Sequence, residues 1–337
     1  MPEHSNLAEP TDLAEFRAFA AALGQDPLHV QGAGGNVSLK HNGAMWVKAS
    51  AAWLEEAVAR NIFPVIDYVQ AVTQLEEETE PIYRRLDNDP SLRPSIETSL
   101  HIALPHRIVA HVHAVAVIAL AVRLDVVMLC EEKLEGLSSV FVPYARPGWP
   151  LTQALRAVQK SDAVPNVYIL GNHGLIVGGE TVAEVKALLA DVAARLEMPV
   201  RQAPIADVRF LVDAQGSKWR LPQSAAVHGL VTDELSHDYA TGGSLYPDHV
   251  VFLGRGCRSV SGHQIDSIDP LRNPMILVER KGVLLANGLS PAGEAMAECL
   301  AAVVARIPPW SRLNYLTSRD ESELLNWDAE KYRQTAT

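Results

Sequence analysis

Segments rich in β-branched residues alternate along this chain with segments in which apolar residues recur every three or four positions. The stretch RIVAHVHA at 107–114 is typical of a buried strand, whereas 181–196 has helical spacing and begins with TVAE, a capping-box sequence. Such alternation predicts an α/β architecture in which helices cover a sheet. The same reasoning predicts helices at 12–23, 51–60, 96–104 and 114–122, and strands at 45–50, 167–170 and 174–179.

A change in composition near Pro199–Pro204 predicts a boundary between two units. We expect a larger α/β domain over 12–204 and a smaller α/β extension over 205–337. In the extension, a helix is expected at 291–307 and strands are expected at HVVFLG, MILVER and GVLLAN.

The extension resembles part of the first domain. ILGNHGLIVGGETVAEVKALL and LVERKGVLLANGLSPAGEAMA share the order strand, turn, strand, helix, and His173 of the first falls opposite Lys281 of the second. PHRIVAHVHA likewise resembles PDHVVFLGRG. Two explanations stay open: 205–337 includes a degenerate half-copy that lost its histidines, or βα units are similar by chance. A different strand order in the two units would exclude the half-copy.

Charge and hydropathy exclude several classes of function. The formal net charge of −11 argues against broad nucleic-acid binding, which depends on Lys and Arg contacts to phosphates. The N-terminus lacks the basic and apolar regions of a signal peptide, and the most apolar stretch, 108–122, is too short to cross a membrane. Cys130, Cys257 and Cys299 have no CxxC spacing, which favours free thiols in a reducing compartment. We therefore expect a soluble, cytoplasmic protein.

Histidines on the predicted strand at 107–114 indicate a metal site. Side chains alternate along a strand, so His111 and His113 point to the same face. A catalytic zinc ion commonly has three protein ligands and one open position. His173, between Gly171 and Gly174, is the candidate third ligand, because the glycines allow a close backbone approach. The alternative is that these are ordinary core or surface histidines.

Glu97 and the segment GAGGNVS at 32–38 are candidates for chemistry beside the metal. Glu97 begins a predicted helix just before the histidine strand, where it could move a proton next to a metal-polarised carbonyl. It could equally be a glutamate that complements the helix dipole. GAGGNVS has the small residues of an anion-binding nest, but lacks the GxGxxG dinucleotide pattern; a simple helix-to-strand turn is the alternative.

Together, GAGGNVS, WVKAS, PSIETSLH, HVH and NHGLIVGG resemble the motifs of the class II aldolase/adducin family, in order and approximate spacing over residues 12–200. A further likeness, including the tail LLNWDAEKYRQ, is to the aldolase portion of bifunctional rhamnulose-phosphate aldolase/dehydrogenases. The resemblance implies a mixed β-sheet flanked by helices and a homotetramer. It implies Zn²⁺ held by His111, His113 and His173, with Glu97 as the acid/base. It also implies that the substrate phosphate is held by Gly35, Asn36, Ser50 and Ser95.

Three features depart from this family pattern. Ala51 replaces a glycine and Ile96 replaces a serine that sugar-phosphate aldolases often have, and both changes remove phosphate-binding features. Family aldolases use a tyrosine to protonate the leaving aldehyde, and Tyr144 is the candidate here. Because the chain ends at Thr337, the dehydrogenase half of the bifunctional enzymes is expected to be absent.

The resemblance implies a metal-dependent lyase that cleaves a ketose phosphate to dihydroxyacetone phosphate and an aldehyde through a metal-stabilised enediolate. The same chemistry leaves open an epimerase, a decarboxylase or a dehydratase, and manganese or cobalt in place of zinc. A non-catalytic assembly module, like the adducin heads, is the alternative from another class.

Overall fold

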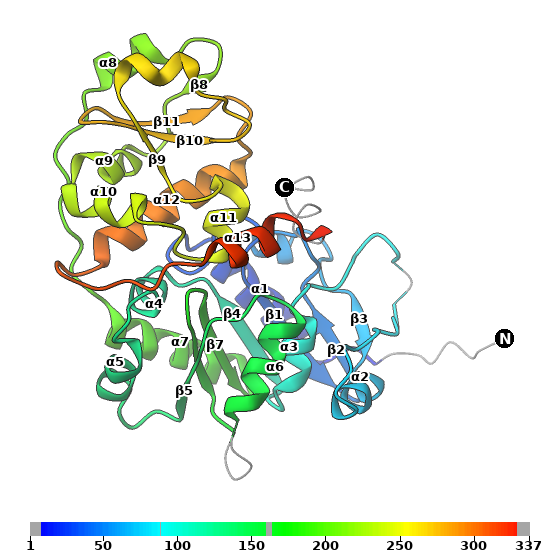
Figure 1. Ribbon diagram of the computed structural model, residues 1–337. Coiled ribbons are helices and arrows are strands. Elements are labelled where there is room, and N and C mark those ends of the chain that lie inside the picture. Colours follow the sequence, from blue (N-terminus) through cyan, green and yellow to red (C-terminus); the bar gives the residue numbers. More distant parts are fainter. Residues whose placement is uncertain (1–7, 88, 160–163, 329–337) are drawn as a thin grey trace.

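The computed structural model describes residues 8–87, 89–159 and 164–328 (Figure 1). Its larger sheet has seven strands, and all neighbours are antiparallel except β5 and β6, which run parallel. In spatial order the strands are β3 (Val65–Asp67), β2 (Ala44–Val47), β1 (Asn36–His41), β4 (Ile108–Val112), β7 (Gly174–Gly179), β6 (Val167–Leu170) and β5 (Ser139–Val142). The expected mixed α/β architecture is confirmed.

Helices cover both faces of this sheet. Ile108 and Ala110 of β4 belong to the hydrophobic cluster formed with α1 (Leu13–Gly24), α4 (Val115–Ala121), α7 (Val182–Leu196) and the short 3₁₀ helix η1 (Leu54–Ala57). The other face is covered by α2 (Tyr68–Glu76), α3 (Thr98–Ala103) and α6 (Trp149–Val158), while α5 (Val126–Lys133) precedes the edge strand β5.

Strand alternation decides which face carries the candidate site. Val109 of β4 packs with Leu100 of α3, so His111, two residues further along, lies on the α3 face. In the sheet register His111 stands opposite Asn36 of the neighbouring strand β1. The end of β4, the start of β1 and the beginning of α3 therefore meet at one place.

A second, four-stranded sheet forms the smaller α/β extension. Its spatial order is β8 (Trp219–Arg220), β11 (Gly282–Ala286), β10 (Met275–Val278) and β9 (Arg258–Val260). One face packs with α8 (Val208–Ala214) and η3 (Gly262–Ser267). The other packs with η2 (Ala225–His228), α9 (Gly229–Thr232), α10 (Glu234–Thr241), α11 (Pro247–Leu253) and α12 (Pro291–Arg306).

The helix α12 joins the two units. It packs against α4 of the larger unit as well as α11 of the extension, and Figure 1 shows it between the two sheets. A single hydrophobic cluster includes residues of both sheets, such as Val37 of β1 and Leu277 of β10. The last helix, α13 (Ser318–Leu325), packs against α11. The extension is thus attached through a continuous apolar core.

Two expected elements differ from the structure. HVVFLG was expected to be a strand, but it lies in the helix α11. Pro247 starts this helix. Every residue of α11 is buried, so the helix needs no polar face. Its sequence therefore lacks the helical alternation of polar and apolar residues that would distinguish it from a buried strand. The helix expected at 51–60 is only the 3₁₀ turn Leu54–Ala57. The helices expected at 12–23, 96–104, 114–122, 181–196 and 291–307 are confirmed.

The strand order bears on the half-copy hypothesis. The order β8-β11-β10-β9 repeats β4-β7-β6-β5 in chain order and in direction, including the single parallel pair. The hairpin turns also correspond: Asn172 and Arg280 both have positive φ, at 53° and 59°. The proposed match of PHRIVAHVHA to PDHVVFLGRG is wrong, because the first is a strand and the second a helix. The rest favours the half-copy, which stays a prediction.

The sequence predicts free thiols and no membrane-spanning segment, and two observations concern these predictions. Cys130, Cys257 and Cys299 are all free, and Cys130 and Cys299 are buried. Within the described residues, no helix has both the length and the apolar character that a membrane crossing requires.

Candidate metal centre

Four side chains from three separate segments converge on the α3 face of the larger sheet. His111 belongs to β4, His113 follows its end, His173 lies in the turn between β6 and β7, and Glu97 directly precedes α3. The turn packs closely on β4, since a Cβ on Gly174 would collide with the Val112 carbonyl oxygen. The glycine next to His173 therefore allows the approach that the sequence predicts.

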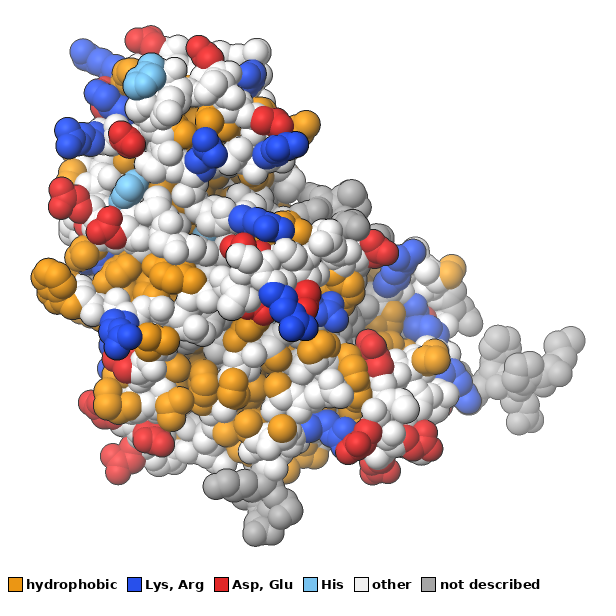
Figure 2. Space-filling view, in the orientation of Figure 1, with side chains coloured by type: hydrophobic (Ala, Val, Ile, Leu, Met, Phe, Trp, Pro, Cys, Tyr) orange, Lys and Arg blue, Asp and Glu red, His pale blue; other side chains and the backbone are white. Residues whose placement is uncertain are grey.

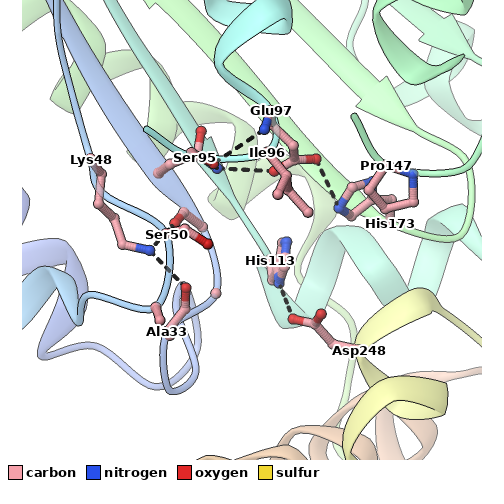
Figure 3. A pocket seen from close by; sticks show the side chains of 14 residues that line it. Ala33, Lys48, Ser50, Ser95, Ile96, Glu97, His113, Pro147, His173 and Asp248 are labelled. Atoms are coloured by element: carbon pink, nitrogen blue, oxygen red, sulfur yellow. Dashed lines mark hydrogen bonds and ion pairs between the residues drawn. The ribbon is translucent and has the colours of Figure 1, made fainter. Parts of the chain in front are cut away.

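The three imidazoles form a compact group. Each pair of rings has a centroid separation of 4.9–5.1 Å. One nitrogen from each ring lies within 4.8 Å of the others, which is the spacing of ligand atoms around one ion. Glu97 lies beside them, with Oε2 at 3.4 Å from His111 Nε2 and Oε1 at 3.6 Å from His173 Nε2. Figure 3 shows Glu97 and His173 facing each other across this space.

The donor atoms suit a divalent metal ion. All four side chains are buried, yet Nε2 of His111, Nε2 of His113 and Oε1 of Glu97 have no hydrogen-bond partner among the described residues. Burial lowers the pKa of His111, and it lowers the pKa of His173 to about 3, so both rings are neutral at neutral pH. Neutral imidazole is the form that binds metal. Buried polar atoms without partners are costly, and an ion would satisfy them together.

A buried network orients Glu97. Burial alone would raise its pKa, but His111, His173, His113 and the hydrogen bond from Asn36 lower the pKa to about 2. Asn36 Nδ2 donates to Glu97 Oε2 at 2.9 Å. The amide of Asn36 is held in this orientation because its Oδ1 accepts from His101 Nε2, while His101 Nδ1 accepts from Ser38 Oγ at 2.8 Å. Burial keeps His101 neutral by lowering its pKa to about 3.

A pocket opens in front of this centre (Figure 3). All four candidate phosphate-binding residues line it, together with Glu97, His113 and His173; the four are Gly35, Asn36, Ser50 and Ser95. Gly35 has φ of +60°, and a Cβ there would be 2.9 Å from the His111 carbonyl oxygen, so this position requires glycine. The phosphate role of these residues stays a prediction, and Asn36 and Ser95 already hydrogen-bond within the Glu97 network.

Tyr144, the candidate proton donor, is not among the residues described as lining the pocket; Pro147 of the same loop is. Its hydroxyl has no hydrogen-bond partner among the described residues, and burial raises its pKa. The two departures from the family pattern do line the pocket. Ile96 adds an apolar side chain, and Ala51 has φ of 63°, the backbone conformation that a glycine would favour.

Two lining residues were missed by the sequence analysis. Lys48 is buried at the end of β2, and its Nζ donates to the carbonyl oxygens of Ala33 and Gly35 at 2.7 and 2.9 Å, which braces the glycine loop. A lysine within the strand motif WVKAS was a visible signal. Asp248 comes from α11 of the extension, and its Oδ2 is 3.0 Å from His113 Nδ1. No sequence signal connected it with the site.

The family model described as Class II Aldolase and Adducin N-terminal domain matches residues 16–199, which contain the three histidines and Glu97. This chain therefore belongs to the class II aldolase/adducin family. The extension that supplies Asp248 lies outside the matched residues.

Individual relatives resemble between 51% and 58% of the chain. The "Uncharacterized oxidoreductase YuxG" of Bacillus subtilis (strain 168) is 30% identical over an alignment of 189 residues, which covers 51% of this chain and only 27% of that protein. Two solved structures are the N-terminal class II aldolase domain of a conserved protein from Thermoplasma acidophilum and an L-fuculose 1-phosphate aldolase. The first has 24% identity and a TM-score of 0.48, and covers 57% of this chain and 96% of its own. The second has 15% identity and a TM-score of 0.42, and the match covers 58% of this chain and 86% of the aldolase chain.

Proposed function

We propose that this chain is a zinc-dependent aldolase that cleaves a ketose phosphate to dihydroxyacetone phosphate and an aldehyde. The observation that carries the proposal is the convergence of three buried imidazoles on one small space, with unpartnered nitrogens and a carboxylate alongside. A purely structural core has no need of such a group, since each unpartnered buried polar atom reduces stability.

His111, His113 and His173 would hold the ion. When bound, it supplies Lewis acidity toward the carbonyl and neighbouring hydroxyl oxygens of the ketose. In the condensation direction the Glu97 carboxylate would remove a proton from the carbon that attacks the aldehyde; in the cleavage direction it would first accept a proton, released from the substrate hydroxyl, and then deliver it to the enediolate carbon. The hydrogen bond from Asn36 holds the Glu97 carboxylate in place for that transfer.

The glycine loop and its surroundings would hold the phosphate. Gly35 and Ser50 present backbone and hydroxyl groups to the pocket, and Lys48 adds a buried positive charge behind the loop. These groups support a phosphorylated substrate. Members of one family share enediolate chemistry, so an epimerase, decarboxylase or dehydratase of this type would use the same ion and the same Glu97.

Metal analysis and a substrate panel test the proposal. We expect purified protein to contain about one Zn²⁺ per chain and to release dihydroxyacetone phosphate from at least one ketose 1-phosphate, detected with a coupled glycerol-phosphate dehydrogenase. Glu97→Gln should retain zinc but lose at least ~100-fold in kcat, the usual contribution of a general acid/base. His113→Ala should lose both zinc and activity. Glu294→Gln, which alters a buried carboxylate far along the chain and outside the pocket, is the control.

The outcomes separate the alternatives. A stable protein that binds no divalent metal would favour an assembly module and refute the enzyme. Full activity in Glu97→Gln would refute the proton role. Turnover of a sugar phosphate without release of dihydroxyacetone phosphate would replace the aldolase by another reaction of the family.

We also propose a homotetramer, as the family resemblance implies, located in the cytoplasm, as the sequence predicts. Support comes from large apolar side chains that the single chain leaves exposed near α5, namely Leu124, Val127, Met128 and Trp310. Figure 2 shows hydrophobic side chains gathered over this side of the larger sheet. Exposed apolar patches commonly mark interfaces. Light scattering after size-exclusion chromatography measures the assembly, and a monomer at micromolar concentration would refute it.

A further inference from the structure

We infer that Asp248, from the C-terminal extension, is a positioning residue of the metal centre that orients His113 toward the ion. The inference rests on the proposed metal centre and deepens it. It makes residues of the extension part of the site, although the family match ends at residue 199.

The contact is direct and buried. Asp248 Oδ2 is 3.0 Å from His113 Nδ1, and the two side chains have exposed fractions of only 3% and 7%. In Figure 3 the carboxylate approaches the His113 ring from the side away from Glu97 and His173. Among the described residues, the group whose ligand atoms lie within 4.8 Å of one another contains the three histidines and not Asp248. Asp248 thus contacts His113 on the side of the ring away from the other two ligand candidates.

The geometry determines which nitrogen of His113 is free for a metal. A carboxylate oxygen can only accept, so Asp248 at 3.0 Å favours the tautomer in which Nδ1 carries the ring proton. Nε2 then presents its lone pair, and Nε2 is the nitrogen that has no hydrogen-bond partner in the part of the chain that the structure describes. His111 is arranged in the same way, because its Nδ1 donates to the Leu175 carbonyl oxygen at 3.1 Å. A partner on the far nitrogen is the usual means of orienting a metal-binding imidazole.

Both sides of the contact are built to maintain it. Asp248 is the second residue of α11, a helix that is buried along its whole length and packed against α12. On the other side, a Cβ on Gly34 would be 2.9 Å from His113 Nδ1 and 3.3 Å from Asp248 Oδ2. The glycine loop thus leaves the space in which the two side chains meet.

A second contact from the extension supports His173. The preceding residue, Asn172, has φ of 53°, and its side-chain amide donates to the carbonyl oxygens of Leu245 and Asn314 at 2.9 and 2.6 Å. Asn314 Nδ2 donates back to Asn172 Oδ1 at 2.9 Å. The extension therefore fixes the turn that carries one histidine and the ring orientation of another.

The test compares full-length variants for metal binding as well as turnover. Asp248→Ala removes the acceptor, whereas Asp248→Asn keeps an acceptor oxygen without its charge. Glu294→Gln is the matched control, because Glu294 is a buried carboxylate of the same extension that pairs with Arg220 at 2.8 Å. Zn²⁺ affinity is measured by competition with a chromophoric chelator, the coordination geometry by the visible spectrum of the Co²⁺ form, and folding by circular dichroism.

We expect Asp248→Ala to lose roughly 10–100-fold in Zn²⁺ affinity, the range found for partners of metal-binding histidines, and to alter the Co²⁺ spectrum. Asp248→Asn should recover part of the affinity, and Glu294→Gln should bind like the wild type. Wild-type affinity and spectrum in both Asp248 variants would refute the inference alone. An equal loss in Glu294→Gln would refute it too, by tracing the effect to general destabilisation. A wild-type chain that binds no metal would refute the proposed function as well.

Discussion

Replacing Gly35 by alanine tests how tightly the glycine loop packs against β4, the strand that carries His111. Gly35 has φ of +60°, and a Cβ there would stand 2.9 Å from the His111 carbonyl oxygen and 3.3 Å from Val30 Cγ2. The left-handed conformation costs an L-residue about 1–2 kcal/mol, and overpacking against backbone typically adds about 1–3 kcal/mol. Alanine also restricts the unfolded chain, which offsets about 0.4–1 kcal/mol. We therefore expect Gly35→Ala to lower the free energy of unfolding by about 1–5 kcal/mol.

Comparison with Gly216→Ala separates the steric part of the expected loss of stability from the part due to backbone strain. Gly216 has a similar φ of +53°, but a Cβ there would meet nothing within 4 Å. It should therefore cost about 1 kcal/mol or less, from backbone strain alone. Urea unfolding of both metal-free variants measures the two losses, with metal removed because a bound ion would add its own stabilisation. Equal losses in the two variants would refute the argument that the His111 carbonyl leaves no room for a side chain.

Gly35→Ala should also lower the affinity for Zn²⁺. Since the β4 backbone at His111 must shift to admit the new methyl group, Gly35→Ala should also bind Zn²⁺ less tightly than Gly216→Ala does. Unchanged Zn²⁺ affinity would mean that β4 does not move and that the loop yields instead.

Two further predictions concern stability. Burial lowers the pKa of His249 from 6.5 to about 4. The unfolded chain therefore gains a proton first as the pH falls. The free energy of unfolding is therefore unaffected by protonation of His249 above pH 6.5. Between pH 6.5 and about 4 it falls as the unfolded chain takes up the proton, by about 3 kcal/mol in all. His249→Gln should flatten the pH dependence of urea unfolding in that window, and an unchanged slope would contradict the assignment. Ala51→Gly should stabilise the protein by up to about 1 kcal/mol, because Ala51 has φ of 63°; a loss of stability in the same assay would show that the backbone there is unstrained.

The sequence could predict the elements whose periodicity is clear. Alternation along β4 placed His111 and His113 on one face, and the structure brings their rings to a centroid distance of 5.0 Å. The glycines around His173 indicated a close backbone approach, which the packing of Gly174 on Val112 explains. In each case a local rule, period two or a missing Cβ, decided the outcome.

Asp248 could not be predicted for two physical reasons. It lies 135 positions after His113, and nothing local to either residue specifies that long-range contact. Its helix, α11, is buried on all sides, so the apolar run PDHVVFL has neither helical nor strand period and was assigned to a strand. The network of Ser38, His101 and Asn36 was equally hidden, because it joins side chains of β1 and α3 that meet only after folding.

The β6–β7 and β10–β11 hairpins show how the extension, with the same strand order as part of the larger sheet, can support the candidate site although its corresponding positions lack the three histidines. Both turns have the same hydrogen bond, from His173 N to Leu170 O and from Lys281 N to Val278 O. In the extension, however, Lys281 pairs with Asp207 at 2.8 Å in a partly exposed position, and β8 is the two residues Trp219–Arg220, which offer no histidine pair. Within β8 and this turn, the positions that match His111, His113 and His173 therefore carry no histidine. The extension instead directs α11 onto the end of β4, where Asp248 contacts His113, and the segment around Asn314 onto the first hairpin, where it binds Asn172. The half-copy hypothesis, which stays a prediction, is compatible with these contacts: a copy without its own ligands would still be retained if the other unit depends on it for the orientation of its ligands.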